Sequence, residues 1–108
     1  HGAPHQGIDI AAEFRVPVYA AGAGEVVYAG DQLSGYGNVI ILRHDQSTTT
    51  LYGHNSELKI KTGRKVKADE VVALLGSTGR STGPHLHFEI RQNETATNPR
   101  KYLPKSRF

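Results

Sequence analysis

Short runs of β-branched and aromatic residues, many of them bounded by glycines, dominate this chain of 108 residues. Such runs favour β-strands, because these side chains fit a pleated and half-buried surface. No window places apolar residues at helical spacing over three turns, so we expect at most a short helical turn after Asn98. The pattern predicts a mostly β domain with little helix, built as a single antiparallel, barrel-sandwich-like sheet. Strands are expected at residues 5–10, 16–20, 24–30, 38–44, 48–54, 71–76 and 85–91.

Length and composition narrow the class of protein. We place one domain at residues 1–108, and the chain has no apolar run of about 18 residues that would span a membrane. The net charge of +3 favours a polyanionic partner such as nucleic acid, teichoic acid or an anionic cell wall, or it only keeps the surface solvated. The basic runs lack interleaved aromatic residues, which argues against nucleic acid. The absence of Cys excludes a thiolate-bound structural zinc.

Histidine and aspartate occur in two short pairs near opposite ends of the chain. Residues two apart in a strand share a face, so His85 and His87 are expected to point the same way. By the same rule His5 and Asp9 share a face, and Gly7 between them leaves room for a metal or a substrate. Two imidazole nitrogens and one carboxylate form the ligand set of a catalytic zinc with one open position. The pattern predicts a metal site made of the first pair and one histidine of the second.

Other polar residues are candidates for supporting roles. His54 ends a strand-like run in which alternation places it on the face of Tyr52, and the pattern alone also fits an exposed histidine at a strand end. Glu89 shares a face with the second histidine pair, so it either orients an imidazole or faces solvent. Arg80 lies in a loop of small residues, where it could meet an anionic group of a substrate. That loop lacks the Gly-Lys-Ser/Thr ending of a phosphate-binding loop, which argues against nucleotide binding.

Several segments together resemble the lysostaphin-type zinc peptidases, also called the LytM or M23 family. The matching segments are His5-x-Gly7-Ile8-Asp9-Ile10-Ala11-Ala12, Pro17-Val18-Tyr19-Ala20-Ala21, Gly35-Tyr36-Gly37-Asn38, Tyr52-Gly53-His54, Ser81-Thr82-Gly83-Pro84-His85-Leu86-His87-Phe88-Glu89, Asn98-Pro99 and Tyr102-Leu103. The resemblance covers nearly the whole chain. The run into His-Leu-His is the most specific of these matches.

The resemblance implies a role for each matching residue. His5, Asp9 and His87 would bind one zinc ion per chain, and His54 and His85 would act in catalysis. Family domains usually have a strand and a loop before the first ligand. Only four residues precede His5 here, so we expect this N-terminal strand of the usual domain to be missing.

The resemblance also implies a function, that of a zinc metalloendopeptidase acting on peptide bonds of bacterial cell-wall peptidoglycan. The bond would lie in the stem-peptide cross-link or in a bridge, and the enzyme would work outside the cytoplasmic membrane, in the periplasm, in the cell envelope or after secretion. We expect Tyr36 and Arg80 to line the substrate groove. Peptidoglycan is the expected partner, with a precursor segment or a regulatory protein as a further one.

Two alternatives belong to other functional classes. The middle segment, around Tyr52-Gly53-His54-Asn55, also resembles non-catalytic relatives that bind the cell wall or activate a cell-wall amidase; because all five positions of the zinc and catalytic set are present here, the enzyme is favoured. Residues 66–75 resemble barrel-sandwich carrier domains. Lys67 lacks the setting of a modified lysine, and the sugar phosphotransferase carriers, which share the His-x-Gly-Ile-Asp stretch, lack the His-Leu-His run.

Overall fold

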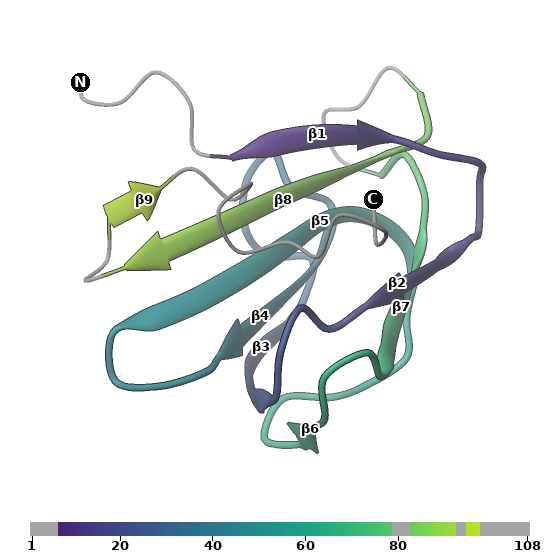
Figure 1. The fold of residues 1–108 in the computed structure, drawn as a ribbon. Helices are drawn as coiled ribbons and strands as arrows, with labels where there is room; N and C mark the ends of the chain where they lie inside the picture. The colour runs from purple at the N-terminus through teal and green to yellow at the C-terminus, as the bar shows by residue number, and fades with distance from the viewer. Residues whose placement is uncertain (1–6, 79–82, 93–94, 98–108) are drawn as a thin grey trace.

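The alternating and β-branched segments of the chain form strands. The computed structural model describes residues 7–78, 83–92 and 95–97. The strands in these residues are β1 (Ile8–Ala11), β2 (Pro17–Tyr19), β3 (Gly24–Gly30), β4 (Asn38–Arg43), β5 (Thr48–Leu58), β6 (Lys65–Val66), β7 (Val71–Leu75), β8 (His85–Gln92) and β9 (Thr95–Thr97) (Figure 1). None of the described residues forms a helix. The prediction of a mostly β domain is confirmed.

The strands differ from the expected ones mainly at their ends. β5 continues to Leu58, beyond the expected end at residue 54. β6 and β9 were not expected, since they are two and three residues long and too short to show an alternating pattern. The helical turn expected after Asn98 falls outside the described residues, and so do residues 5 and 6 of the first expected strand.

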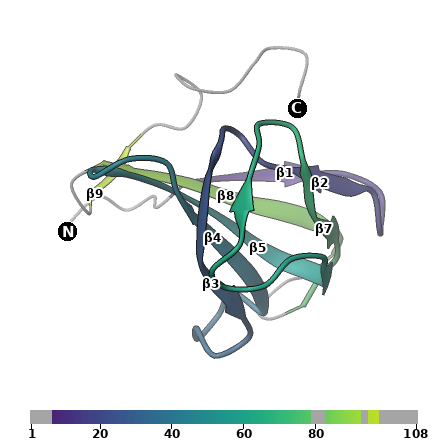
Figure 2. The same cartoon turned by 90° about the horizontal axis from the view of Figure 1, so that it is seen from below.

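All the strand pairs belong to one antiparallel sheet, in the order β1-β8-β5-β4-β3-β6, with β9 on β8. β5 lies at the centre: its first half pairs with β4 and β8, and from Asn55 onward it pairs with β7. β7 also pairs with β2, so the sheet turns round the core instead of lying flat (Figures 1 and 2). The prediction of a single antiparallel sheet is confirmed.

The core lies on one face of β8 and the histidines lie on the other. The buried residues of β8 include Leu86, Phe88 and Ile90. Phe88 packs against Tyr52 of β5 with the ring centroids 5.3 Å apart, edge to face. Side chains alternate along a strand, so burial of this face directs His85 and His87 to the opposite face. A slip of one residue in register would bury both imidazoles, which fixes the pairing of β8.

The chain approaches β8 very closely at Gly7, just before β1 begins. Ile8 and Ile10 pack against the core and Asp9 between them is exposed, as the alternation predicts. A Cβ atom on Gly7 would lie 2.0 Å from the carbonyl oxygen of Phe88 and 2.7 Å from Cγ of Glu89. The interpretation that Gly7 leaves room for a metal or a substrate is therefore wrong. This glycine makes room for the backbone of β8.

Within the described residues there is no helix of the length and apolar character needed to cross a membrane. That residues 1–108 form one domain stays a prediction.

Replacing Gly7 with Ala should destabilise the fold, because the added methyl group meets the rigid backbone of β8 at Phe88 as well as the buried side chain of Glu89. We expect the free energy of unfolding in urea to fall by about 1–3 kcal/mol, the usual cost of overpacking. Gly83→Ala is the matched control, since a Cβ atom there meets nothing within 4 Å. Equal stability of the two variants would contradict the close approach of β1 to β8.

Candidate active site

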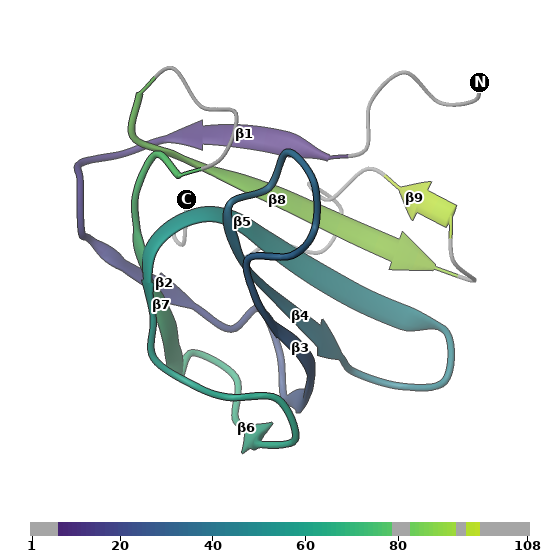
Figure 3. The same cartoon turned by 180° about the vertical axis from the view of Figure 1, so that it is seen from behind.

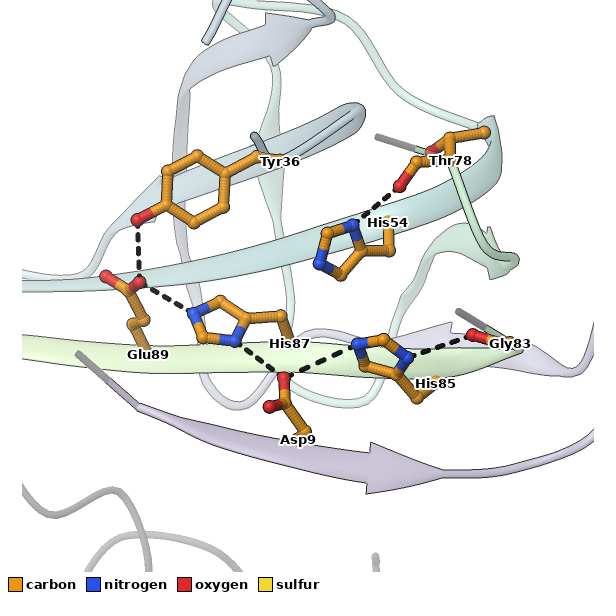
Figure 4. A network of polar contacts seen from close by, with 8 residues as sticks. All are labelled: Asp9, Tyr36, His54, Thr78, Gly83, His85, His87 and Glu89. Carbon is orange, nitrogen blue, oxygen red and sulfur yellow. Dashed lines mark hydrogen bonds and ion pairs between the residues drawn. The ribbon is translucent and has the colours of Figure 1, made fainter. Parts of the chain in front are cut away.

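The pairing of β1 with β8 brings the two predicted histidine and aspartate motifs together. Asp9 lies directly opposite His87 in the antiparallel ladder, and Ala11 lies opposite His85. Nδ1 of His87 is 2.7 Å from Oδ1 of Asp9, and Nε2 of His85 is 3.5 Å from the same oxygen (Figure 4). Residues 78 positions apart in the sequence thus meet at one carboxylate oxygen.

His54 reaches the same place from β5. Its ring centroid lies 4.8 Å from that of His85 and 6.1 Å from that of His87. Its main-chain N–H donates to the carbonyl of Tyr36 at 2.7 Å, and Nδ1 bonds the carbonyl of Thr78 at 2.6 Å. Only 6% of the residue is exposed, so the reading of His54 as an exposed strand-end histidine is wrong.

The backbone of His54 explains why its ring lies in the site. Its φ of 66° is in the left-handed region, which residues other than glycine rarely adopt. This conformation interrupts the alternation of β5, so that Tyr52 faces the core while His54 faces the histidines of β8. The prediction that both share one face is wrong for this reason. Strained backbone of this kind clusters at functional sites.

The environment of His54 favours its neutral form. Burial lowers the pKa of His54, and the nearby His85 and His87 lower it further, against the raising effects of the Thr78 carbonyl and of Asp9. A carbonyl oxygen can only accept a hydrogen bond, so Nδ1 carries the hydrogen. The neutral ring then has its lone pair on Nε2, the arrangement of a general base.

Glu89 is fully buried directly behind the site. Its Oε2 accepts hydrogen bonds from Nε2 of His87 and from the hydroxyl of Tyr36, both at 2.8 Å, and its Oε1 accepts one from Nε of Arg91 at 2.9 Å. Burial acts to raise the pKa of Glu89, but the bonds from His87 and Tyr36 and the charge of Arg91 outweigh it and lower the pKa. Of the two roles open for Glu89, the structure fits the orientation of an imidazole and excludes a solvent-facing carboxylate.

Tyr36 lies in the loop between β3 and β4, which crosses strands β5 and β8 in the view from behind (Figure 3). Its ring centroid is 5.6 Å from that of His87. Burial, together with the hydrogen bond to Glu89, raises the pKa of its hydroxyl, so this group stays a donor. Sequence reasoning missed the contact between Tyr36 and Glu89, because no periodicity connects a loop residue to a strand 53 positions away.

The polar atoms around Asp9 suit a cation. Ionised carboxylates can only accept, so the bonds to Glu89 and Asp9 together fit a His87 ring with a hydrogen on both nitrogens, whereas a neutral ring with its hydrogen on Nε2 aims the lone pair of Nδ1 at Asp9. Two acceptors 2.7 Å apart repel each other unless a proton or a metal ion lies with them. The bond to Glu89, partly opposed by burial and joined by the bond to Asp9, raises the pKa of His87, so the surroundings favour positive charge here. Nitrogen and carboxylate oxygen are ligands that zinc accepts.

Two predicted residues, the ligand His5 and the groove residue Arg80, lie outside the described residues. Across residues 7–78, 83–92 and 95–97, no group of three or more His, Cys, Asp or Glu side chains is placed to hold a metal ion. What the described part of the site supplies is one pair of expected ligands, Asp9 and His87.

Relatives of known sequence carry the same domain as part of longer chains. An uncharacterized lipoprotein, YgeR of Escherichia coli, is 47% identical over 100 residues, which cover 93% of this chain and 39% of that protein. The murein hydrolase activator NlpD of Escherichia coli is 43% identical over 101 residues, 94% of this chain and 26% of that protein. The chain thus spans only a minor part of the length of these relatives. YgeR, and the lipoprotein NlpD/LppB homolog of Pseudomonas aeruginosa, are named as lipoproteins, which agrees with the expected location outside the cytoplasmic membrane.

Solved structures of peptidases share the fold. The catalytic domain of lysostaphin from Staphylococcus simulans superposes with a TM-score of 0.84 at 38% identity, covering 91% of this chain and 77% of that one. A zinc-containing peptidase from Vibrio cholerae gives a TM-score of 0.82 at 37% identity, covering 87% of this chain and 29% of that one. The lysostaphin-type fold that the sequence predicts is confirmed.

The sequence model of peptidase family M23 matches residues 3–99, which include every described strand and all the described residues of the site. In agreement with its lipoprotein relatives, the chain works outside the cytoplasmic membrane. From the match to the family model and the shared fold, it belongs to peptidase family M23.

Proposed function

We propose that the chain is a zinc-dependent endopeptidase that hydrolyses peptide bonds in bacterial cell-wall peptidoglycan. The observation that carries the proposal is a cluster of four polar side chains from three strands, which lie in contact with one another: Asp9, His54, His85 and His87. A structural role alone does not require a buried histidine with left-handed backbone beside two others. His5, Asp9 and His87 would hold one zinc ion per chain.

In this proposal the residues of the chain bind and orient the metal ion, and the metal ion activates the water and the scissile carbonyl group. When bound, zinc supplies a Lewis acid that polarises a carbonyl group and makes water more acidic near neutral pH. Glu89 keeps the hydrogen of His87 on Nε2, so that Nδ1 offers its lone pair on the side of Asp9. Asp9 adds negative charge, which is exposed enough to be reached from solvent.

The two remaining histidines are suited to proton transfer. His54, kept neutral by burial, presents Nε2 as the acceptor for a proton from the attacking water and can return that proton to the leaving amine. His85 is held by a bond between Nδ1 and the carbonyl of Gly83 at 2.9 Å, and its Nε2 points toward Asp9. With a proton on Nε2 as well, His85 would donate from this position to the scissile carbonyl oxygen and stabilise the negative charge that develops there.

Peptidoglycan is proposed as the substrate because of the relatives. The solved neighbours include the antimicrobial peptidase lysostaphin, and the activator NlpD is named for murein, which is peptidoglycan. A positive net charge suits an anionic cell wall. Arg80 is proposed to line the substrate groove, and a precursor segment or a regulatory protein stays a proposed further partner.

The second candidate is a non-catalytic activator of a cell-wall amidase. It is favoured by the 43% identity to the murein hydrolase activator NlpD. In this case the chain would bind the amidase or the cell wall, and the histidine cluster would take no part in turnover. The two candidates differ in whether the isolated chain cuts peptidoglycan.

Variants of the site should separate metal binding from turnover. Asp9→Ala and His87→Ala remove proposed ligands, so we expect each to lower the zinc content measured by atomic emission after dialysis. His54→Ala removes a proton acceptor and no ligand, so zinc should stay bound while turnover falls about 100-fold or more. Phe14→Ala, at an exposed side chain, is the control that keeps both. Full turnover by His54→Ala would remove it from the catalytic set.

Isolated cross-linked peptidoglycan provides the direct test of function. The zinc-loaded chain should create new amino termini and remove cross-linked fragments, and a chelator should abolish both effects. A parallel assay adds a purified cell-wall amidase. Stimulation of the amidase by wild-type chain and by His54→Ala alike, without any new amino termini from the chain alone, would refute the endopeptidase and support the activator.

A further inference from the structure

The loop that carries Tyr36 contacts Glu89, which binds His87, and also contacts His54. The hydroxyl of Tyr36 donates to Oε2 of Glu89 at 2.8 Å, and the carbonyl of Tyr36 accepts the N–H of His54 at 2.7 Å. We infer that Tyr36 is a positioning residue: its hydroxyl, acting through Glu89, fixes the orientation and tautomer of His87, while its carbonyl fixes the backbone of His54. This inference deepens the proposed function and rests on it for the role of His87 as a ligand.

The buried carboxylate of Glu89 has different partners at its two oxygens. Oε2 of Glu89 receives two hydrogen bonds, from Tyr36 and from His87, whereas Oε1 faces both Nε and Nη2 of Arg91 at 2.9 Å. Arginine prefers to bind a carboxylate side-on through both oxygens. The hydroxyl of Tyr36 opposes that rotation, because turning Oε2 toward Arg91 would take the acceptor away from a partly buried hydroxyl. Tyr36 thus holds Oε2 where His87 needs it.

The imidazole of His87 lies between two carboxylates. Nε2 is 2.8 Å from Glu89 and Nδ1 is 2.7 Å from Asp9, so a neutral ring can place its hydrogen on either side. Only the Nε2–H tautomer leaves the lone pair of Nδ1 for a metal ion. If Glu89 turns away, the hydrogen moves to Nδ1 and bonds Asp9. The ligand pair is then lost to an internal hydrogen bond.

Glycines shape the loop that carries Tyr36 and its contact with β5. Gly35 and Gly37 flank Tyr36 with φ values of 90° and 64°, in the left-handed region that favours glycine. A Cβ atom on Gly53 would lie 3.3 Å from Cδ1 of Tyr36 and 3.6 Å from Cβ of His87, so the missing side chain lets the ring settle against β5. These glycines let Tyr36 lie against the paired strands β5 and β8, which carry His54 and His87.

This role differs from the groove-lining role expected from the sequence. A residue that lines a groove offers its hydroxyl to the substrate, whereas the hydroxyl of Tyr36 is engaged with a fully buried carboxylate. Tyr36→Phe removes the hydroxyl and keeps the ring, the loop and the carbonyl that bonds His54. The variant therefore isolates the action on His87.

The test uses the whole chain in two states. In the metal-free protein, at a pH high enough for His87 to be neutral, long-range proton–nitrogen NMR reports the tautomer of His87 and the solvent exchange of its Nε2 proton. Zinc affinity is measured separately by competition with a chromophoric chelator. For Tyr36→Phe we expect the Nε2 proton to exchange faster, the tautomers to mix, and zinc affinity to fall about 10-fold, the lower end for partners behind a metal ligand.

Two further variants keep the test decisive. Tyr19→Phe is the matched control, because Tyr19 lies on β2, which pairs with β7 and carries no residue of the site; it should change neither readout. Glu89→Gln removes the charge of the carboxylate and should lower zinc affinity about 10- to 100-fold. Unchanged His87 signals and unchanged zinc affinity in Tyr36→Phe would overturn the inference, even if its turnover fell, since that pattern places the hydroxyl on the substrate. The tautomer readout remains decisive if the wild-type chain cuts no peptidoglycan, so the two failures are distinguishable.

Discussion

The antiparallel register between β1 and β8 is the constraint on which the site depends. It places Asp9 opposite His87, and burial of Phe88 and its neighbours on the other face of β8 holds that register. The close approach at Gly7 lets the chain at the start of β1 lie directly against β8. Because the same hydrophobic contacts stabilise the fold and orient the polar faces, the geometry of the ligand pair follows from the packing of the core.

The buried negative charge of Glu89 connects β8 with the loop between β3 and β4. Glu89 is a fully buried carboxylate, and such a group is stable only when it is paired and fully hydrogen-bonded. Arg91, His87 and Tyr36 supply those partners. The need to satisfy one buried anion therefore fixes an imidazole on β8 and a loop between β3 and β4 at once, while the same loop holds His54 in its left-handed conformation.

Alternation along single strands was enough to predict the polar faces of Asp9, His85 and His87, because each strand buries its opposite face. It failed at His54, where a single left-handed residue reverses the face and leaves no trace in the pattern. It also failed at Gly7, whose neighbour is the backbone of another strand. Contacts between a loop and a distant strand, such as Tyr36 with Glu89, depend on the complete fold and have no local signal. The family resemblance, rather than periodicity, singled out His54 and chose His87 over His85 as a ligand.

The central claim is that this register creates a zinc site beside two catalytic histidines. A crystal structure of the zinc-loaded chain, with anomalous data collected on both sides of the zinc edge, tests it most directly. We predict one zinc peak per chain, bound by Oδ1 of Asp9, Nδ1 of His87 and one nitrogen of His5, with His54 and His85 close by but not bound. Zinc found only elsewhere on the chain, or bound to His87 through Nε2 with Glu89 displaced, would contradict the account.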